Sequence, residues 1–395
     1  MRMTQLKTIA DIQTGPFGSQ LHKEDYVETG TPIVTVEHLG NRVFTGQNLP
    51  RVSDSDKARL IKYTLSTGDI VFSRVGSVDR CSYVDKSHDG WMFSGRCLRV
   101  RPTELVDSLY LYYYFCLEET KQFVRNIAVG ATMPSINTKL LGEVEIALPD
   151  LNNQKRIAAV LSSLDDKIEN NQKLNDNLEQ QAQSYFQELF VDNADPEWTT
   201  GTISDLGTVV GGSTPSKAKP EYYTESGIAW ITPKDLSNNK SKFVSHGEND
   251  ITELGLRNSS ASIMPEGTVL FSSRAPIGYI AIAAGEVTTN QGFKSVVPKP
   301  EIGTQFVYFF LKNTLPVIEG MASGSTFKEV SGSTMKNVPA VIPDAETLAK
   351  FSDFCAPIFA QQRILEEQNQ SLATLRDNLL PKLMSGEIDV SAVQL

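Results

Sequence analysis

Two segments of the chain align with each other and indicate an internal repeat. They read GATMPSINTKLLGEVEIALPD at residues 130–150 and GSTFKEVSGSTMKNVPAVIPD at residues 324–344, aligned without a gap. Two other segments repeat at a similar separation: GTPIVTVEHL (30–39) with GIAWITPKDL (227–236), and GDIVFSR (68–74) with GTVLFSSR (267–274) after one insertion. Solenoid units are about 20–50 residues long, so a repeat of nearly half the chain indicates a duplicated domain and a pseudo-twofold internal repeat.

The composition is that of a globular protein. The chain has 395 residues, 40% of them hydrophobic and 21% charged, which favours two or three domains. No apolar run approaches the roughly 20 residues that span a bilayer, and the N-terminus lacks the apolar core of a secretion signal; we therefore expect a cytoplasmic protein with no membrane partner. The four cysteines and four histidines show no metal-ligand spacing, which predicts reduced thiols and no metal site.

The net charge of −10 is unevenly distributed along the sequence. Residues 1–150 and 196–343 are each within one charge of neutrality, whereas residues 151–195 and 344–395 each carry four basic and eight acidic side chains. Affinity for DNA depends on local phosphate contacts rather than on the overall sign of the charge. The balance weakens a nucleic-acid role without excluding it, and it suggests that tight binding needs a partner.

Residues 1–150 and 196–343 each predict a mixed α/β domain with many short strands, giving an α+β protein. Alternating or β-branched patterns indicate the strands, and Gly/Pro-rich joints separate them. Aromatic stretches at 109–115 and 306–311 predict a buried helix packed under the sheet of each domain. The expected strands lie at 31–36, 69–73, 97–101 and 144–148 in the first domain and at 228–232, 268–272, 279–283 and 294–298 in the second.

Residues 151–195 and 344–395 predict two long helices with sustained heptad spacing, the pattern of a supercoiled seam. An antiparallel coiled-coil pair within the chain is the simplest packing, because one chain supplies both helices; dimerisation between two chains is the alternative. Asn171, Asn175, Gln362 and Asn369 are polar seam positions that fix register. Pro357 is expected to kink the second helix and Pro381 to disturb its last turn. The apolar seam comprises Leu161, Leu164, Ile168, Leu178, Ile358, Leu365, Leu372 and Leu379.

Catalytic motifs are lacking. The sequence contains no phosphate loop, no dinucleotide fingerprint, no zinc-protease motif and no nucleophile elbow. Asp150, Asp165 and Lys167 form a nuclease-like P-D…D-x-K pattern, but the last two fall within a heptad helix. A solvated helix face explains them better, and Asp150 and Asp344 are expected to be helix N-caps. No catalytic residue is assigned.

Loops rich in hydroxyl, amide and basic groups are the candidate binding residues. Residues 132–139 and their counterpart 326–333 each follow a glycine and precede the last strand before a long helix. Such groups suit phosphate contacts and base-edge hydrogen bonds, although a self-satisfied turn or an exposed strand-end charge is the alternative for each residue. The candidates are Arg74, Arg80, Arg96, Thr132, Ser135, Asn137 and Lys139 in the first half and Lys234, Arg274, Gln291, Lys294, Ser325, Thr326, Lys328, Ser333 and Lys336 in the second.

In its order of target domain, long helix, target domain and long helix, the chain resembles the specificity subunit of type I restriction–modification systems. Local sequence adds to this resemblance: LPDLNNQKRI at 148–157, LDDKI at 164–168, the C-terminal LRDNLLPKLMSGEI at 375–388 and the glycine-rich loop GGSTPS at 211–216. The first half departs from the last pattern with TGPFGS at 14–19.

The resemblance implies a non-catalytic DNA reader of a bipartite, asymmetric double-stranded target. Residues 1–150 and 196–343 would be target recognition domains, and the helices a ruler and the docking site for two modification subunits. S-adenosylmethionine would be held by those subunits, and ATP and Mg²⁺ by restriction subunits, with no cofactor on this chain. A stand-alone methyltransferase or restriction enzyme, and a coiled-coil scaffold without a DNA role, are the alternatives.

Overall fold

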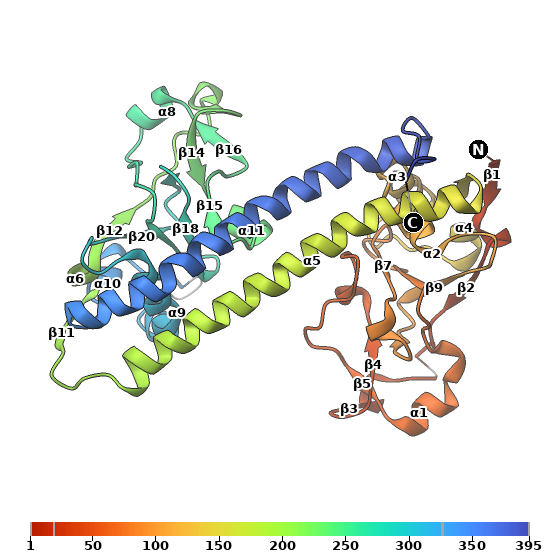
Figure 1. The fold of residues 1–395 in the computed structure, drawn as a ribbon, viewed down its shortest axis with the longest axis horizontal. Coiled ribbons are helices and arrows are strands. Elements are labelled where there is room, and N and C mark those ends of the chain that lie inside the picture. Colours follow the sequence, from red (N-terminus) through yellow and green to blue (C-terminus); the bar gives the residue numbers. More distant parts are fainter. Residues whose placement is uncertain (1, 19, 325–327, 394–395) are drawn as a thin grey trace. The chain divides into compact units, whose positions relative to one another are not determined.

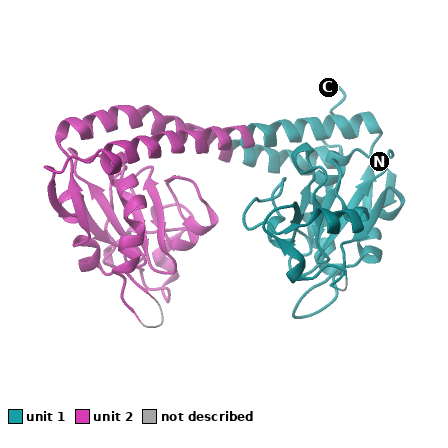
Figure 2. Cartoon of the chain, turned by 90° about the horizontal axis from the view of Figure 1, so that it is seen from below, with its two compact units in different colours: residues 1–168, 371–395 teal, residues 169–370 magenta. Residues whose placement is uncertain are grey.

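The computed structural model describes residues 2–18, 20–324 and 328–393, which form two compact units. Unit 1 comprises residues 1–168 and 371–395, and unit 2 comprises residues 169–370 (Figure 2). Each unit contains one globular domain and parts of both long helices, because the unit boundary crosses each helix near its middle.

Unit 1 contains two four-stranded sheets and a two-stranded ribbon (Figure 1). The first sheet, antiparallel throughout, has the order β2-β9-β6-β7. The second has the order β3-β5-β4-β8, in which β4 and β8 are parallel. The strands are β1 (Arg2–Gln5), β2 (Ala10–Thr14), β3 (Tyr26–Val27), β4 (Thr31–Val34), β5 (Arg51–Val52), β6 (Ile70–Ser73), β7 (Cys81–Tyr83), β8 (Met92–Phe93), β9 (Cys97–Pro102) and β10 (Glu145–Leu148), with helices α1 (Asp54–Arg59), α2 (Ser108–Cys116), α3 (Glu118–Ile127) and α4 (Thr138–Gly142).

Unit 2 repeats this plan with one added strand. Its first sheet has the order β12-β20-β17-β18-β15, where β15 extends the sheet beside β18, and its second has the order β13-β16-β14-β19. The strands are β11 (Thr199–Thr202), β12 (Gly207–Gly211), β13 (Tyr223–Thr224), β14 (Ile228–Ile231), β15 (Phe243–Val244), β16 (Asn249–Ile251), β17 (Val269–Ser273), β18 (Ile277–Ala283), β19 (Thr288–Thr289), β20 (Lys294–Pro298) and β21 (Pro339–Ile342), with helices α6 (Ile203–Leu206), α7 (Pro233–Asn238), α8 (Glu253–Arg257), α9 (Thr304–Gly320) and α10 (Gly332–Lys336).

The two long helices begin where the acidic caps were predicted. Asp150 accepts a hydrogen bond from the Asn153 backbone N–H at 3.0 Å at the start of α5 (Leu151–Gln187), and Asp344 accepts one from the Thr347 N–H at 2.9 Å at the start of α11 (Ala345–Ser385). A π-helical turn, Glu188–Asp192, follows α5. Both carboxylates occupy a helix N-terminus, where free N–H groups and the helix dipole favour negative charge.

Neither proline interrupts α11, so the disturbed last turn expected at Pro381 is wrong, and the kink expected at Pro357 stays a prediction. A proline removes the hydrogen bond to the carbonyl four residues earlier, which belongs here to Asp353 and Asp377. Both of those residues and both prolines are exposed. The freed carbonyls face solvent, and the buried face of α11 keeps its packing.

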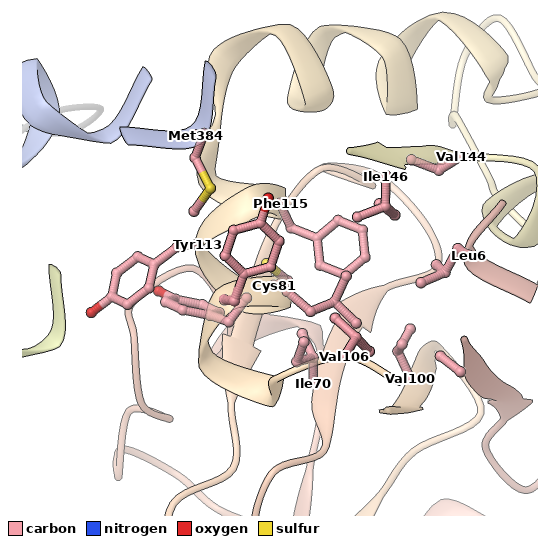
Figure 3. Close-up of a cluster of buried hydrophobic side chains, with 14 of the residues drawn as sticks. Leu6, Ile70, Cys81, Val100, Val106, Tyr113, Phe115, Val144, Ile146 and Met384 are labelled. Atoms are coloured by element: carbon pink, nitrogen blue, oxygen red, sulfur yellow. The ribbon is translucent and has the colours of Figure 1, made fainter. Parts of the chain in front are cut away.

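Each predicted aromatic stretch forms a buried helix against its sheet. In unit 1, Tyr113 and Phe115 of α2 are almost completely buried in the core with Cys81 of β7 and Met384 of α11 (Figure 3). In unit 2, Phe309 of α9 has the same role and contacts the rings of Phe186 and Phe351 from the long helices. The globular domain and the helix pair of each unit therefore share one hydrophobic core.

The helix pair is antiparallel and carries polar contacts at its seam. In unit 2 the Asn171 amide donates to Asn369 Oδ1 at 2.9 Å, and the Gln362 amide donates to the Asn175 carbonyl at 3.2 Å. Partner numbers fall along α11 as they rise along α5, which defines the antiparallel direction. The eight apolar seam residues are all buried or half-buried. Two duplicated α/β domains with an intramolecular antiparallel helix pair confirm the predicted fold.

Asp165 corrects one detail of the sequence interpretation, because it is buried in unit 1 rather than solvated on a helix face. Its carboxylate accepts hydrogen bonds from Tyr113 Oη at 2.6 Å and from Arg376 Nη1 at 2.7 Å. Asp166 is exposed and pairs with Arg42 at 2.5 Å. Within the described part of the chain no group of three or more His, Cys, Asp or Glu side chains is arranged to hold a metal ion.

No helix among the described residues has both the length and the apolar character needed to cross a membrane.

Candidate nucleic-acid interface

Three of the sequence-predicted segments converge in unit 1 at the end of β6. The Arg74 N–H donates to the Arg96 carbonyl at 2.8 Å, and the Arg74 carbonyl accepts from the Ile136 N–H at 2.9 Å. Two residues away in each segment, the Gly76 N–H donates to the Pro134 carbonyl at 2.8 Å. The strand end, the 95–96 loop and the loop before α4 therefore form one continuous surface.

The same convergence occurs in unit 2, where the first two of these hydrogen bonds have counterparts. The Ser273 N–H donates to the Gly292 carbonyl at 2.7 Å, and the Ser273 carbonyl accepts from the Val330 N–H at 3.0 Å. Isolated bridges join Val129 to Ser135 in unit 1 and Ser323 to Glu329 in unit 2, again 194 residues apart. The two candidate sites thus have one backbone frame, and corresponding positions can be identified without ambiguity.

This frame shows where the insertion in the repeat falls. Ser273 makes both backbone bonds that Arg74 makes, so Arg274 lies one residue beyond the position of Arg74. The Arg274 side chain lies 3.4 Å from Glu329 Oε2. Two arginines that align in the sequence therefore occupy different places on the two surfaces.

The early glycine-rich loop joins each site, including the divergent loop of the first half. The Gly15 N–H donates to the Cys97 carbonyl and the Gly212 N–H to the Phe293 carbonyl, which are matched positions. A Cβ atom at Gly15 would lie 2.1 Å from the Ser94 carbonyl oxygen, and one at Gly212 would lie 1.9 Å from the Asn290 carbonyl oxygen. Only glycine allows this close approach, so both loops are anchored in the same way.

This anchoring places Phe17 and Thr214 at corresponding positions, and sequence reasoning missed both. The Phe17 side chain is 55% exposed, and the Arg74 guanidinium carbon lies 5.5 Å from the centroid of its ring. Thr214 instead donates a hydrogen bond to Gln291 Oε1. The sequence signal that could have identified them is the glycine that the two loops share, Gly15 and Gly212. The residues that flank these glycines differ, and this difference hid the match.

The candidate cations of the two sites have different surroundings. Arg74 Nη1 donates to the Gly95 carbonyl at 2.9 Å, and among the described residues no carboxylate forms an ion pair with Arg74, Arg96 or Lys139. In unit 2, Glu329 lies 3.4 Å from Arg274 and 3.8 Å from Lys294, and Lys234 pairs with Glu248 at 2.6 Å. Ser135 occupies the position of Glu329 in unit 1, so that site lacks the neutralising acid.

Burial lowers the pKa of Lys294, while its neighbour Glu329 acts to raise it. Lys234, which is exposed, has a pKa raised by its hydrogen bond to Glu248. A ligand with acceptor groups would therefore compete with a carboxylate for these two ammonium groups.

An open cavity of about 480 Å³ adjoins the unit 2 site. Three of the predicted residues, Lys234, Arg274 and Gln291, line it together with Trp230, whose indole N–H donates to the Ser213 carbonyl at 3.0 Å. The lining combines cationic, amide and aromatic groups. Such a mixture contacts both phosphates and base edges in nucleic-acid complexes.

The remaining predicted residues are placed as follows. Arg80 donates to the Leu39 carbonyl, and Asn137 caps α4 by accepting from the Leu140 N–H at 2.9 Å. Ser331, the counterpart of Asn137, caps α10 and lies 3.1 Å from the hydroxyl of Ser333. Ser325 and Thr326 lie outside the described residues. Thr132, Lys139, Lys328 and Lys336 are exposed, and Ser135 is half-buried, its hydroxyl donating to the Val129 carbonyl at 3.1 Å.

Both sites offer hydrogen-bond donors and acceptors on exposed loops over a rigid sheet, which is a binding surface rather than a reaction centre. Among the described residues of the two sites, no nucleophile, general base and orienting group lie together.

Comparison with known proteins agrees with this division. Residues 1–180 and 196–375 each match the family described as the type I restriction modification DNA specificity domain. The chain is 39% identical over 191 residues to the MjaIX specificity subunit of Methanocaldococcus jannaschii, a match that covers 46% of this chain and 44% of that protein. It is 24% identical over 406 residues to the HindI specificity subunit of Haemophilus influenzae, covering 83% of this chain and 88% of that one.

The fold also has a counterpart among solved structures. The S subunit of a type I restriction–modification system from M. genitalium superposes with a TM-score of 0.62 over 97% of this chain and 95% of that chain, at 18% identity. That likeness concerns the fold alone, and it extends over both repeats and both long helices.

Proposed function

The chain belongs to the type I restriction–modification DNA specificity family, and from this premise we propose that it is the non-catalytic subunit that reads a bipartite DNA target. Each recognition domain contacts one half of the target. Since the family match includes both repeats, the alternatives of a stand-alone enzyme and of a scaffold without a DNA role lose their support.

The observation that carries this proposal is the duplicated frame with unequal side chains. Arg74 and Ser273 make the same pair of backbone hydrogen bonds, yet one side chain is a cationic guanidinium and the other a neutral hydroxyl. A protein that reads two different half-sites needs a common scaffold and different contact groups. This difference lies where the predicted loops converge.

We further infer that the helix pair sets the unspecified gap between the half-sites and supplies the docking surface for modification subunits, two in number. Those subunits supply S-adenosylmethionine and the methylating residues, and restriction subunits supply ATP-dependent chemistry with Mg²⁺. The acidic composition of residues 151–195 and 344–395 supports protein docking on the helices better than DNA contact. A cytoplasmic location, with access to chromosomal DNA, is part of the same proposal.

Duplex binding tests the proposal. The purified chain, alone and with type I modification subunits, is titrated against a duplex library with a randomised 30-base-pair centre over a range of salt concentrations. We expect selection of a two-part sequence and an affinity that falls steeply with salt. Binding without sequence preference in the presence of modification subunits would disprove the reading role.

Domain exchange tests the assignment of one domain to each half. Replacing residues 1–150 by another member's first domain is expected to change one half of the selected sequence and to leave the other unchanged. Inserting one heptad in each long helix is expected to change only the gap. If both halves changed together in either experiment, two independent readers would be excluded.

A further inference from the structure

We propose that Arg74 selects a guanine in one half of the target, with Phe17 and the Gly95 carbonyl holding its guanidinium, and that Gln291 selects an adenine at the corresponding place in the other half. This inference rests on the proposed function and assigns its specificity to particular side chains. It uses four matched positions, which we call the divergent positions: Phe17/Thr214, Arg74/Ser273, Gly95/Gln291 and Ser135/Glu329.

The Arg74 guanidinium is held in one orientation before any ligand arrives. Its Nη1 donates to the Gly95 carbonyl at 2.9 Å, and its carbon lies 5.5 Å from the Phe17 ring centroid. One N–H group is thereby engaged, and among the described residues no acceptor binds Nε or Nη2, which form a fork of donors. A planar fork held in advance loses little side-chain entropy on binding, and the two acceptors of guanine, O6 and N7, match it.

A phosphate would also accept from such a fork, but the comparison between units favours a base. The sugar–phosphate backbone is chemically the same in both halves of a duplex, so phosphate contacts from a common frame need not differ. Base contacts must differ when the half-sites differ. Arg74 is replaced by Ser273 at the same backbone position, which is the behaviour expected of a base contact.

The corresponding place in unit 2 offers an amide in place of a guanidinium. Gly95 is replaced by Gln291, which is exposed and accepts a hydrogen bond from Thr214, the residue that replaces Phe17. The Gln291 amide keeps its NH₂ donors and a second acceptor lone pair. A paired amide donor and acceptor match N7 and N6 of adenine.

The acid at the fourth divergent position strengthens the contrast. Glu329 lies near both Arg274 and Lys294, so these two cations of unit 2 are already paired with a carboxylate. Ser135, the counterpart of Glu329 in unit 1, is uncharged, and among the described residues no carboxylate forms an ion pair with the Arg74 guanidinium. The first site therefore presents a cation to the groove, and the second presents a neutral amide.

The test uses the full chain with modification subunits and the duplex library with the randomised 30-base-pair centre. Arg74→Gln removes the fork and one charge. Arg59→Gln is its control, because it removes one charge from an exposed arginine that bonds to Asp56 on α1. Gln291→Ala tests the second site. The readout is the base preference at each position of the selected sequence, together with the dependence of affinity on salt.

For Arg74→Gln we expect the preference for guanine at one position to fall roughly ten- to hundred-fold, with the other half unchanged. For Gln291→Ala we expect a loss of adenine preference in the other half only. An intact preference in the untouched half shows that each variant is folded. The Arg59→Gln control is expected to leave both halves unchanged.

Two results would overturn the inference in different ways. If Arg74→Gln weakens binding equally for all sequences and reduces the salt slope by about one, Arg74 is a phosphate contact. If the wild-type complex selects no sequence at all, the proposed function fails, and the inference fails with it. Thus a failure of the residue assignment is distinguishable from a failure of the reading role.

Phe17 acts here as a positioning residue, and its test separates orientation from affinity. Phe17→Leu keeps an apolar side chain but removes the ring face under Arg74. We expect the guanine preference to fall while the salt slope stays at the wild-type value, because the arginine charge remains. An unchanged preference in Phe17→Leu would show that the ring does not orient Arg74.

Discussion

Lys242 Nζ lies 2.7 Å from Glu179 Oε2 in the interior of unit 2 and 3.4 Å from the centroid of the Phe359 ring. Gln362 accepts a further hydrogen bond from the same ammonium at 2.8 Å. Lys242 precedes β15, Glu179 belongs to α5, and Gln362 and Phe359 belong to α11. The buried Lys242 side chain therefore connects the recognition domain of unit 2 to both long helices.

The first prediction concerns the titration of this lysine. Burial lowers the pKa of Lys242 from 10.5 to about 8, although the nearby Glu179 carboxylate opposes the change. Between pH 8 and 10.5 the unfolded chain keeps the proton that the folded chain has lost, so the stability contribution of this group rises with pH. Relative to Lys242→Met, we expect the wild type to gain about 2 kcal/mol between pH 7 and pH 9.5.

Urea unfolding of both proteins at several pH values measures this gain, and subtraction removes the other titrating groups. In the variant, the Glu179 carboxylate still has a cationic partner, because Lys312 Nζ lies 2.5 Å from its Oε1 atom. Parallel stability curves for the two proteins would show that Lys242 keeps its proton in the folded state.

The second prediction concerns the polar pair in the helix seam. The Asn171 amide donates a hydrogen bond to Asn369 Oδ1 at 2.9 Å in the part of the helix seam that belongs to unit 2. Polar seam residues fix register at the expense of stability, so the double variant Asn171→Leu with Asn369→Leu is expected to be about 1–2 kcal/mol more stable. Urea unfolding checks this value. A loss of stability would mean that the amide pair contributes more than the apolar packing that replaces it.

The long helices and the eight expected strands were predictable because they depend on periodic burial, whereas β2 and β12 of the two first sheets were not among the expected strands. Heptad spacing placed α5 and α11, and alternating patterns placed the eight expected strands. That α11 continues through Pro357 and Pro381 was not predictable, because it depends on whether the carbonyls that lose their hydrogen bonds lie on the exposed side of the helix. The contact of Phe17 with Arg74 was also hidden, because it joins loops far apart in the sequence that only the folded sheet brings together.

Arg74 and Arg274 show the same limit more sharply. Sequence alignment pairs them, but hydrogen bonding assigns the position of Arg74 to Ser273. An insertion at a strand end can fall before or after an arginine without changing the strand pattern. Three-dimensional register decides which residue faces the ligand, and sequence periodicity of two residues does not resolve that choice.

The third prediction concerns the buried carboxylate of unit 1. Asp165 accepts from Tyr113 and Arg376, and it is only 8% exposed. Asp165→Ala leaves the buried Tyr113 hydroxyl without its acceptor, while Arg376 keeps Asp377 as a partner at 2.7 Å, and we expect a loss of about 2–3 kcal/mol in the free energy of unfolding. Asp166→Ala is the control: its ion pair with Arg42 involves an exposed carboxylate, and a loss below about 1 kcal/mol is expected. Equal losses in the two variants would contradict the structural role of Asp165.

The last prediction concerns the loop that carries Phe17. A Cβ atom at Gly15 would lie 2.1 Å from the Ser94 carbonyl oxygen, whereas one at Gly18 has no neighbouring atom within 4 Å. Gly15→Ala must therefore displace the loop from the sheet, and we expect it to destabilise the chain by about 1–3 kcal/mol. Because the displaced loop carries the ring that supports Arg74, the guanine preference in one half of the selected sequence is expected to weaken as well.

Gly18→Ala is the matched control in the same loop, and it is expected to leave both thermal stability and base preference close to wild type. Thermal unfolding and selection from the randomised duplex library measure the two effects separately. If Gly15→Ala lost stability but kept the guanine preference, the loop would be a structural anchor only, and Arg74 would be oriented by the Gly95 carbonyl alone. A loss of both quantities together would show that the close approach of this glycine to the sheet is what holds the reading side chain in place.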